Sequence, residues 1–236
     1  MKANANKFQL MFLSRDNISV TDNMQICNTE ITSCNSVNIL GIEIDNKLTF
    51  TGHINEMCNQ AGKQINALKR IKQYLSKDSK TVVYNSYINS IFNYCSPIWM
   101  FTSKANEEKI EKTNKRALRF VTNKSHLSYE ELCEKEVYLD IMKRSIKACA
   151  ILMFKVKNDI APTYIKHMFR MQHTPYDMRD NEKLILPHFN TVNFGKNSIK
   201  YYGAKLWNML PVDIKNSASL NTFKSAVNKW LLNYKE

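Results

Sequence analysis

Short apolar runs in the N-terminal part of the chain predict β-strands. Residues 7–13 and 37–44 are mostly apolar, and residues 24–31 show a weaker alternation. The run at 37–44 is rich in β-branched residues, which favour strands, and it contains Gly41, where a kink or a close backbone approach is expected. We therefore expect a small antiparallel sheet of about three strands, which needs helices or a missing partner to cover it.

Helical periodicity begins after a turn at 45–47. From residue 52 to residue 75, apolar side chains recur every three or four positions, so they share one face of a single long helix. These positions are Ile54, Met57, Ala61, Ile65, Leu68, Ile71 and Leu75. The opposite flank carries the cations Lys63, Lys69, Arg70 and Lys72.

A second helix is predicted over residues 79–96. Ser79 can cap its N-terminus, and Pro97 is expected to end it. Apolar residues cover most of its circumference, which indicates a buried helix.

A third helix, from about residue 105 to residue 121, carries a basic stripe. The stripe consists of Lys109, Lys112, Lys115, Arg116 and Arg119. It is either a solvated face laced with pairs to nearby glutamates or a face that contacts phosphates. Acidic residues become rare after Glu111 whereas basic residues continue, and this favours phosphate contact.

The remainder of the chain is also predicted to be mostly helical. Ser128 and Glu131 have the spacing of a capping box, which marks the start of a short helix. The expected helices are 128–136, 137–157, a short one begun by Ala161-Pro162, 198–208 and 219–234, with an irregular segment at 172–198. We therefore expect a mainly α protein with a small N-terminal antiparallel β-sheet.

The charge balance indicates a polyanionic partner. The chain has 34 Lys and Arg against 21 Asp and Glu, a formal net charge of +13. A positive surface attracts polyanions by Coulomb steering and counterion release, so nucleic acid is the expected partner. The alternative is a merely basic soluble protein. A membrane partner is less well supported because the helices carry mixed charge and no apolar run is long enough to span a bilayer.

The N-terminal residues and the cysteines predict the compartment. Residues 1–6 are polar and unlike a signal peptide, so we expect an intracellular protein, nuclear or cytoplasmic and not secreted. The six cysteines include no C-x-x-C pair, which favours buried free thiols over a zinc site. The cysteines are Cys27, Cys34, Cys58, Cys95, Cys133 and Cys149.

No catalytic set of residues is visible in the sequence. Two-metal chemistry needs clustered carboxylates, and Asp177 and Asp180 come nearest to that, with Arg179 between them favouring a salt-bridged loop. The chain has no G-x-S-x-G motif and no glycine-rich phosphate loop, and its five histidines lack metal-ligand spacing. We therefore predict neither catalytic residues nor metal ligands.

Five stretches, in order along the chain, resemble the C-terminal part of the polymerase region in jockey-type non-LTR retrotransposon reverse transcriptases. They are Asn6-Lys7-Phe8 with Met11-Phe12; Ile39 to Asp45 with Leu48-Thr49-Phe50 and His53-Ile54; Tyr87 to Trp99 with Lys115-Arg116-Ala117; Asn158 to Ile165; and Tyr176 to Arg179 with Leu186-Pro187, Gly203, Trp207 to Pro211 and Ile214. The first is similar to the family's Asn-x-x-Lys-Thr strand, with Phe8 where Thr is usual. The second is similar to the Leu-Gly-x-x-x-Asp strand that ends the palm and touches the primer.

This resemblance implies a division of the chain and a function. Residues 1–50 would be the end of the palm, 51–125 a thumb-like helical bundle, and 126–236 a C-terminal helical region. The family's Mg²⁺-binding aspartates would lie upstream, so we expect no cofactor in this chain and no polymerase activity from it alone. The expected partners are an RNA or DNA duplex or primer–template, bound without sequence preference, and the upstream polymerase domains.

The candidate nucleic-acid-binding residues follow from the basic helices and the resemblance. They are Lys7, Gly41, Lys63, Lys69, Arg70, Lys72, Lys112, Lys115, Arg116 and Arg119. For Lys7, a solvent-facing lysine on a strand is an equally good interpretation. The alternative function is a domesticated helical adaptor that binds a protein partner, with Phe8, Leu10 and Phe12 forming an exposed apolar patch.

Overall fold

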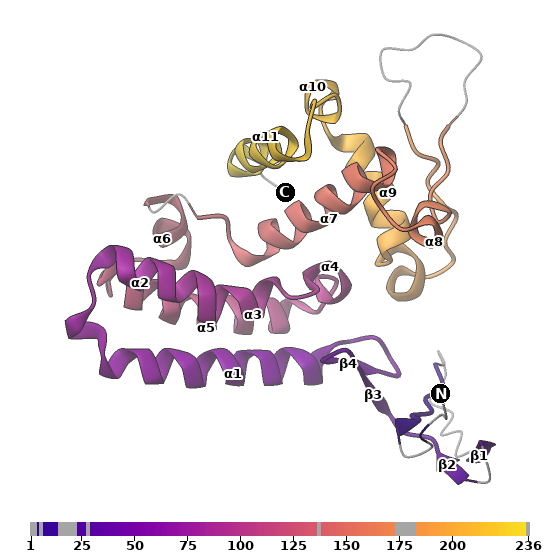
Figure 1. Cartoon of the computed structure of the whole chain (residues 1–236), viewed down its shortest axis with the longest axis horizontal. Helices are drawn as coiled ribbons and strands as arrows, with labels where there is room; N and C mark the ends of the chain where they lie inside the picture. Colours follow the sequence, from indigo (N-terminus) through magenta and orange to yellow (C-terminus); the bar gives the residue numbers. More distant parts are fainter. Residues whose placement is uncertain are drawn as a thin grey trace.

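The predicted fold class is confirmed. The computed structural model describes residues 4, 7–13, 23–26, 29–135, 138–172 and 183–234. This part of the chain is mainly helical, and its strands are confined to the N-terminal region (Figure 1). None of the described helices is both long enough and apolar enough to cross a membrane.

Two hairpins stand where we expected a sheet of about three strands. Strand β1 (Asn23–Ile26) pairs with β2 (Thr29–Thr32), and β3 (Ser36–Ile39) pairs with β4 (Ile42–Asp45), each pair antiparallel and in its own sheet. The prediction of single strands at 24–31 and 37–44 was therefore wrong. Each of these apolar runs is long enough to fold back on itself.

The reversal between β3 and β4 takes place at Leu40 and Gly41. Both residues have positive φ, 52° and 84°, as a two-residue type I′ turn requires. The Asn38 side chain accepts a hydrogen bond from the Gly41 amide at 3.0 Å, and the Tyr94 hydroxyl donates to the Leu40 carbonyl at 2.7 Å. Gly41 marks this turn, but leucine is not a usual turn residue, so the apolar pattern hides the reversal.

Residues 7–13 do not form the expected strand. Among the described residues, Leu10 makes one isolated bridge to Ser33, and its carbonyl accepts a hydrogen bond from the Cys34 amide at 2.8 Å. Leu10 is half-buried, whereas Phe8 and Phe12 are exposed. A short apolar run does not by itself determine whether a ladder of hydrogen bonds forms.

The predicted turn at 45–47 is confirmed, and Asp45 organises it. The Asp45 carboxylate accepts hydrogen bonds from the backbone amides of Lys47 and Thr49, each at 3.1 Å, and of Phe50 at 2.6 Å. Phe50 is the N-cap residue of the next helix and provides no side-chain cap. Asp45 therefore fixes the connection from β4 into that helix.

The long helix α1 (Thr51–Arg70) confirms most of the helix expected at 52–75. Ile54, Ala61 and Ile65 are completely buried. The α-helix ends earlier than predicted, and a 3₁₀ turn follows at Lys72–Tyr74 (η2), so Ile71 is exposed and does not extend the apolar face.

The helix predicted over 79–96 differs in its start, its continuity, its burial and its end. It begins with α2 (Lys77–Val83) and is capped by Ser76, whose hydroxyl accepts from the Ser79 amide, so Ser79 is not the cap. A π-helical turn, η3 (Tyr84–Asn89), interrupts it before α3 (Ser90–Asn93).

The burial of this helix was also overestimated. Tyr84, Ile88 and Phe92 are fully buried, but Val82 and Tyr87 are 65% and 59% exposed, so only one face packs. The helix ends at Asn93, and Pro97 lies in the first turn of α4 (Ser96–Trp99), where a proline is well tolerated.

The next two predicted helices are confirmed. Helix α5 (Lys104–Thr122) is capped by Ser103, and helix α6 (Tyr129–Lys135) is preceded by the expected capping box. In this box, the Ser128 amide donates to the Glu131 carboxylate at 2.7 Å, and the Glu131 amide donates to the Ser128 hydroxyl at 3.1 Å.

The remaining helices follow the predicted order with shifted bounds. Helix α7 (Ile141–Lys157) begins later than residue 137 because Asp140 accepts from the Lys143 amide at 2.7 Å and caps it. The others are α8 (Thr163–Lys166), α9 (Ile199–Met209), α10 (Val212–Lys215), which was not predicted, and α11 (Leu220–Asn233). The described part of 172–198 includes a π-helical turn, Val192–Lys196 (η4). Val137 lies outside the described residues.

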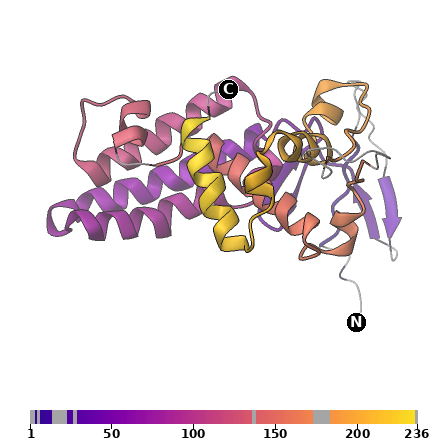
Figure 2. The same cartoon turned by 90° about the horizontal axis from the view of Figure 1, so that it is seen from above.

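The buried side chains form two clusters. One joins α1, the α2–α3 segment, α5 and α6 around residues such as Trp99 and Leu118. The other joins α7, α9 and α11 around residues such as Trp207 and Phe223. Figure 1 shows the corresponding layers, and in the view from above α11 lies over the middle of the molecule (Figure 2). The expected domain boundaries at residues 50 and 125 stay predictions.

A polar network around Arg144 of α7 joins the two layers. Its guanidinium donates to the Tyr84 hydroxyl at 3.1 Å, to the Leu139 carbonyl at 2.7 Å and to the side-chain oxygen of Asn89. Tyr84 in turn donates to the buried Asn114 of α5 at 2.8 Å. Burial raises the pKa of Tyr84, so its hydroxyl stays neutral and can act as donor and acceptor at once.

We predict that Arg144→Met lowers the free energy of unfolding by about 2–4 kcal/mol, because three acceptors lose a charged donor in a partly buried site. The measurement is urea unfolding followed by tryptophan fluorescence. Arg170→Met, at an exposed position, is the control and is expected to change stability by less than about 0.5 kcal/mol. Equal effects of the two substitutions would contradict the structural role of the network.

Candidate nucleic-acid interface

Helices α1 and α5 lie side by side and run in the same direction (Figure 1). Asn106 donates to Thr51 at 3.0 Å near the start of both helices. Further along, Lys109 donates to Asn55 at 2.5 Å, and Arg116 donates to Asn66 at 3.4 Å. These cross-helix bonds place the basic stripe of α5 beside the polar side of α1.

The two helices combine their cations into one surface. Lys63 and Arg70 are seven residues apart on α1, and Lys109 and Arg116 are seven apart on α5, so each pair spans two turns, about 10 Å, along one face. All four side chains are exposed, and so is Lys112 beside them. We call Lys63, Arg70, Lys109, Lys112 and Arg116 the basic face.

Acidic groups gather on a different side of α5. Burial raises the pKa of Glu111, and the nearby carboxylates of Asp140 and Glu130 raise it further. These acids surround a hollow next to α6 and α7. Lys112 has no carboxylate partner among the described residues. Glu111 and its acidic neighbours therefore lie on a different side of α5 from Lys112, whereas the exposed Glu108 lies one turn before Lys112.

Arg119 and Lys115 are less available than the basic face. Arg119 donates to the Leu127 carbonyl at 3.1 Å, and its Nε atom is buried without a hydrogen-bond partner in the described part of the chain. Lys115 is half-buried. Arg119 was predicted to contact nucleic acid, but its side chain instead binds the backbone of the following loop.

Three other predicted residues gather at the far end of α1. Lys69, Arg70 and Lys72 line a hollow of about 540 Å³ together with Lys80. Lys80 was missed because it falls in a helix predicted from its apolar residues. No sequence signal separates it from an ordinary surface lysine.

Lys7 and Gly41 are not brought to the basic face. Lys7 is exposed in the N-terminal segment that packs beside the hairpins, and Gly41 forms the turn between β3 and β4. The β3–β4 hairpin adjoins the start of α1, the end opposite Arg70 (Figure 1). The positive φ of Gly41 is a sufficient structural reason for a glycine there.

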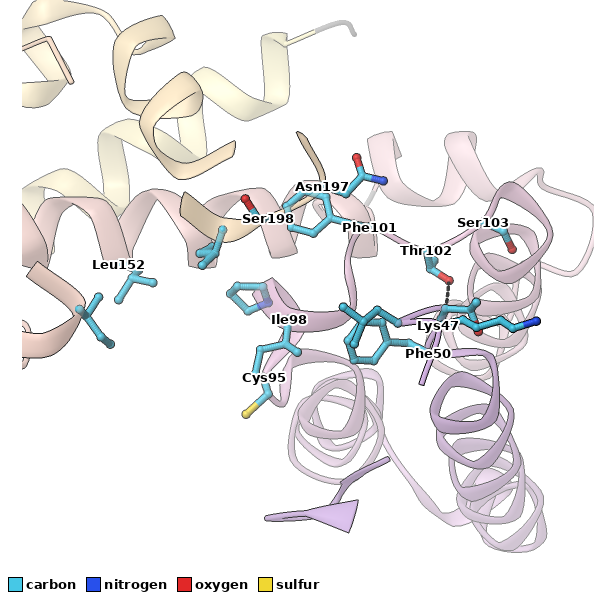
Figure 3. A pocket seen from close by; sticks show the side chains of 15 residues that line it. Lys47, Phe50, Cys95, Ile98, Phe101, Thr102, Ser103, Leu152, Asn197 and Ser198 are labelled. Atoms are coloured by element: carbon cyan, nitrogen blue, oxygen red, sulfur yellow. Dashed lines mark hydrogen bonds between the residues drawn. The ribbon is translucent and has the colours of Figure 1, made fainter. Parts of the chain in front are cut away.

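A hollow of about 690 Å³ lies between the two layers, next to the start of α1 (Figure 3). Apolar side chains such as Phe50, Ile98 and Leu152 line most of it. Within the described ranges, no group of three or more His, Cys, Asp or Glu residues could hold a metal ion. Asp177 and Asp180 lie outside the described residues.

The described cysteines are free thiols. Burial raises the pKa of Cys133 to about 11 and that of Cys149 to about 12, so both stay protonated at neutral pH. Cys58 is buried as expected, Cys95 is half-buried, and Cys34 is exposed, contrary to the expectation of buried thiols. Cys27 lies outside the described residues.

Comparisons with known proteins give one informative similarity. No family model matches the chain, and no solved structure matches it. The chain is 31% identical over 87 residues to the probable RNA-directed DNA polymerase from transposon BS of Drosophila melanogaster. The match covers 36% of this chain and 10% of that protein. It supports a reverse-transcriptase-like relationship.

We predict that Arg119→Gln lowers the free energy of unfolding by about 1–2 kcal/mol, because the Leu127 carbonyl loses its charged donor. Lys112→Gln on the same helix is the matched control, and we expect a change within about 0.5 kcal/mol because its side chain is exposed. Thermal and urea unfolding both report the difference. A larger loss for Lys112→Gln would contradict the inward role of Arg119.

Proposed function

We propose that this chain corresponds to the part of a jockey-type non-LTR retrotransposon reverse transcriptase that follows the metal-binding aspartates. In this proposal, residues 1–50 are the end of the palm, residues 51–125 a thumb, and residues 126–236 a C-terminal helical region. The chain grips an RNA or DNA duplex by its backbone. The five resembling stretches and the similarity to a transposon polymerase support this proposal.

The basic face is the observation that carries the proposal. It presents five exposed cations from two adjacent helices, and Glu111 of α5 lies on a different side among other carboxylates. Lysine and arginine on such a surface reach phosphate oxygens, which are alike in every sequence, so binding has little sequence preference. Lys109 and Arg116 are each held by an asparagine of α1, which reduces the rotamer entropy lost when a phosphate binds.

A fixed connection from the hairpins to α1 suits a palm–thumb junction. Asp45 binds three backbone amides of the connecting segment, and the Thr102 hydroxyl donates to the Thr49 carbonyl at 3.3 Å. Tyr94 binds the Leu40 carbonyl at the hairpin turn. These bonds set the angle between the basic face and the β3–β4 hairpin. A primer–template held along the basic face would therefore meet the hairpin in one orientation.

We predict that the purified chain binds a primer–template duplex with steep salt dependence. The slope of log affinity against log salt concentration grows by about 0.9 for each phosphate that the protein neutralises. Replacing Lys63, Arg70, Lys112 and Arg116 by Gln should therefore reduce the slope by about 3–4 and weaken binding strongly at low salt. Fluorescence anisotropy at several salt concentrations measures both quantities.

The matched control replaces four exposed lysines outside α1 and α5 by Gln. These are Lys183, Lys200, Lys205 and Lys229, and the substitution changes net charge equally. If charge alone matters, both variants lose the same affinity, and the basic face has no special role. Absence of any duplex binding by the unaltered chain at low salt would refute the proposal.

We also predict that the chain alone does not extend a primer in the presence of Mg²⁺ and deoxynucleotides. Polymerase chemistry uses carboxylates that hold two metal ions, and the proposal places those aspartates upstream. The measurement is a gel-based extension assay with a complete reverse transcriptase as positive control. Extension that survives further purification and tracks with the protein would overturn this placement.

The second candidate function is a helical adaptor for a protein partner. The exposure of Leu13 and Leu40, 58% and 86%, favours it, together with the exposed Phe8 and Phe12. These apolar side chains lie in the hairpin region, away from the basic face. Crosslinking followed by mass spectrometry separates the two functions, since a defined protein partner without nucleic acid supports the adaptor.

A further inference from the structure

The hollow at the far end of α1 collects cations from several separate segments. Its volume is about 540 Å³. Its lining residues are Lys69 and Arg70 at the end of α1, Lys72 and Gln73 of η2, Lys80 of α2, and Asn123 just after α5. No carboxylate is among these residues. Segments more than fifty residues apart therefore contribute only cations and amides to one concave surface.

Lys80 is the most unusual member of this group. Only 6% of the residue is exposed, and no hydrogen bond or ion pair of its amino group exists within the described part of the chain. Lysine is almost never so buried unless it is paired, because removing an ammonium group from water without an anion is costly. Since Lys80 lines the hollow, the small part that water still reaches opens into it.

Two helix ends contribute to holding these cations together. Helices α1 and α5 run in the same direction, so their C-termini both lie at this end of the molecule. The negative end of a helix dipole favours nearby cations, by up to about 1 kcal/mol each at the surface. A bound anion would reduce the mutual repulsion of the four cations further.

We propose that this hollow binds a single phosphate group. Lysine and arginine donors bind phosphate oxygens through short, charge-assisted hydrogen bonds, and the amides of Gln73 and Asn123 supply neutral donors beside them. Arg70 belongs to both the hollow and the basic face, so the hollow continues that surface. The source of the phosphate rests on the proposed function: it is a backbone phosphate of the bound duplex.

The first arm of the test uses inorganic phosphate with the full chain. We expect amide chemical shifts of residues 69–73, 80 and 123 to move in a saturable way. Sodium chloride at the same ionic strength should leave them in place. Lys80→Met should abolish the saturable shifts while the thermal midpoint stays within a few degrees, because methionine fills the buried volume of the lysine stem. Lys205→Met, at an exposed position of α9, should leave the shifts unchanged.

The second arm measures duplex binding by the same variants. Lys80→Met should weaken binding about eightfold near 0.1 M salt and reduce the salt slope by about one, the value of one neutralised phosphate. Should Lys80→Met fail to fold, Lys69→Gln with Lys72→Gln tests the same hollow from its accessible rim. Lys200→Gln with Lys205→Gln is the matched pair.

The two arms separate the two proposals. Phosphate-dependent shifts at the hollow without duplex binding support an anion site and overturn the nucleic-acid function. If the Lys80 and rim-pair substitutions do not change duplex binding and phosphate causes no saturable shifts, the phosphate-site proposal is overturned. The proposal that the basic face binds the duplex is then unaffected. Shifts at the hollow and a reduced salt slope together support both.

Discussion

The fold depends on the way Arg144 ties helix α7 to the layer beneath it. Each buried cluster is built largely by its own helices, and α7 contributes Ile141 to the first and most of its apolar residues to the second. The guanidinium adds directional bonds to this contact by reaching Tyr84, Asn89 and the Leu139 carbonyl. Apolar surfaces can slide past one another, whereas a planar donor with three fixed acceptors allows one arrangement.

The π-helical turn η3 is part of this arrangement. Tyr84 and Asn89 lie at its two ends, and both face Arg144. An uninterrupted α-helix would place residues five apart about 140° apart around its axis. The wider π turn reduces this angle, so both side chains can reach one guanidinium. Such single π turns often occur where a side chain must be placed against the ordinary helical repeat.

Periodicity and capping chemistry located several of the helices, although Ser79 was wrongly predicted as a cap. Helices α1, α5 and α11 repeat apolar residues regularly, and the capping box before α6 depends on residues only three apart. Local rules are sufficient for such features. The β3–β4 hairpin was missed because leucine is not a usual turn residue, and the Tyr94 hydroxyl that binds the Leu40 carbonyl is far away in the sequence. The candidate site was predictable only in part, for a similar reason. The exposure of Lys112 and Arg116 agrees with the spacing of the α5 stripe.

The Arg119 side chain points away from solvent because it binds the Leu127 carbonyl in the following loop. The burial of Lys80 depends on segments that meet only in three dimensions. Spacing within one helix contains no information about either.

The parallel course of α1 and α5 also has a consequence for the order of folding. Thr51 and Asn106, which meet at the start of the two helices, are separated by 55 residues. Contacts of such long sequence separation form slowly, because a long loop must close first. During synthesis, the apolar face of α1 therefore emerges well before α5 exists to cover it. The α2–α3 segment is made in between and packs on α1, so it protects that face from aggregation until α5 is made.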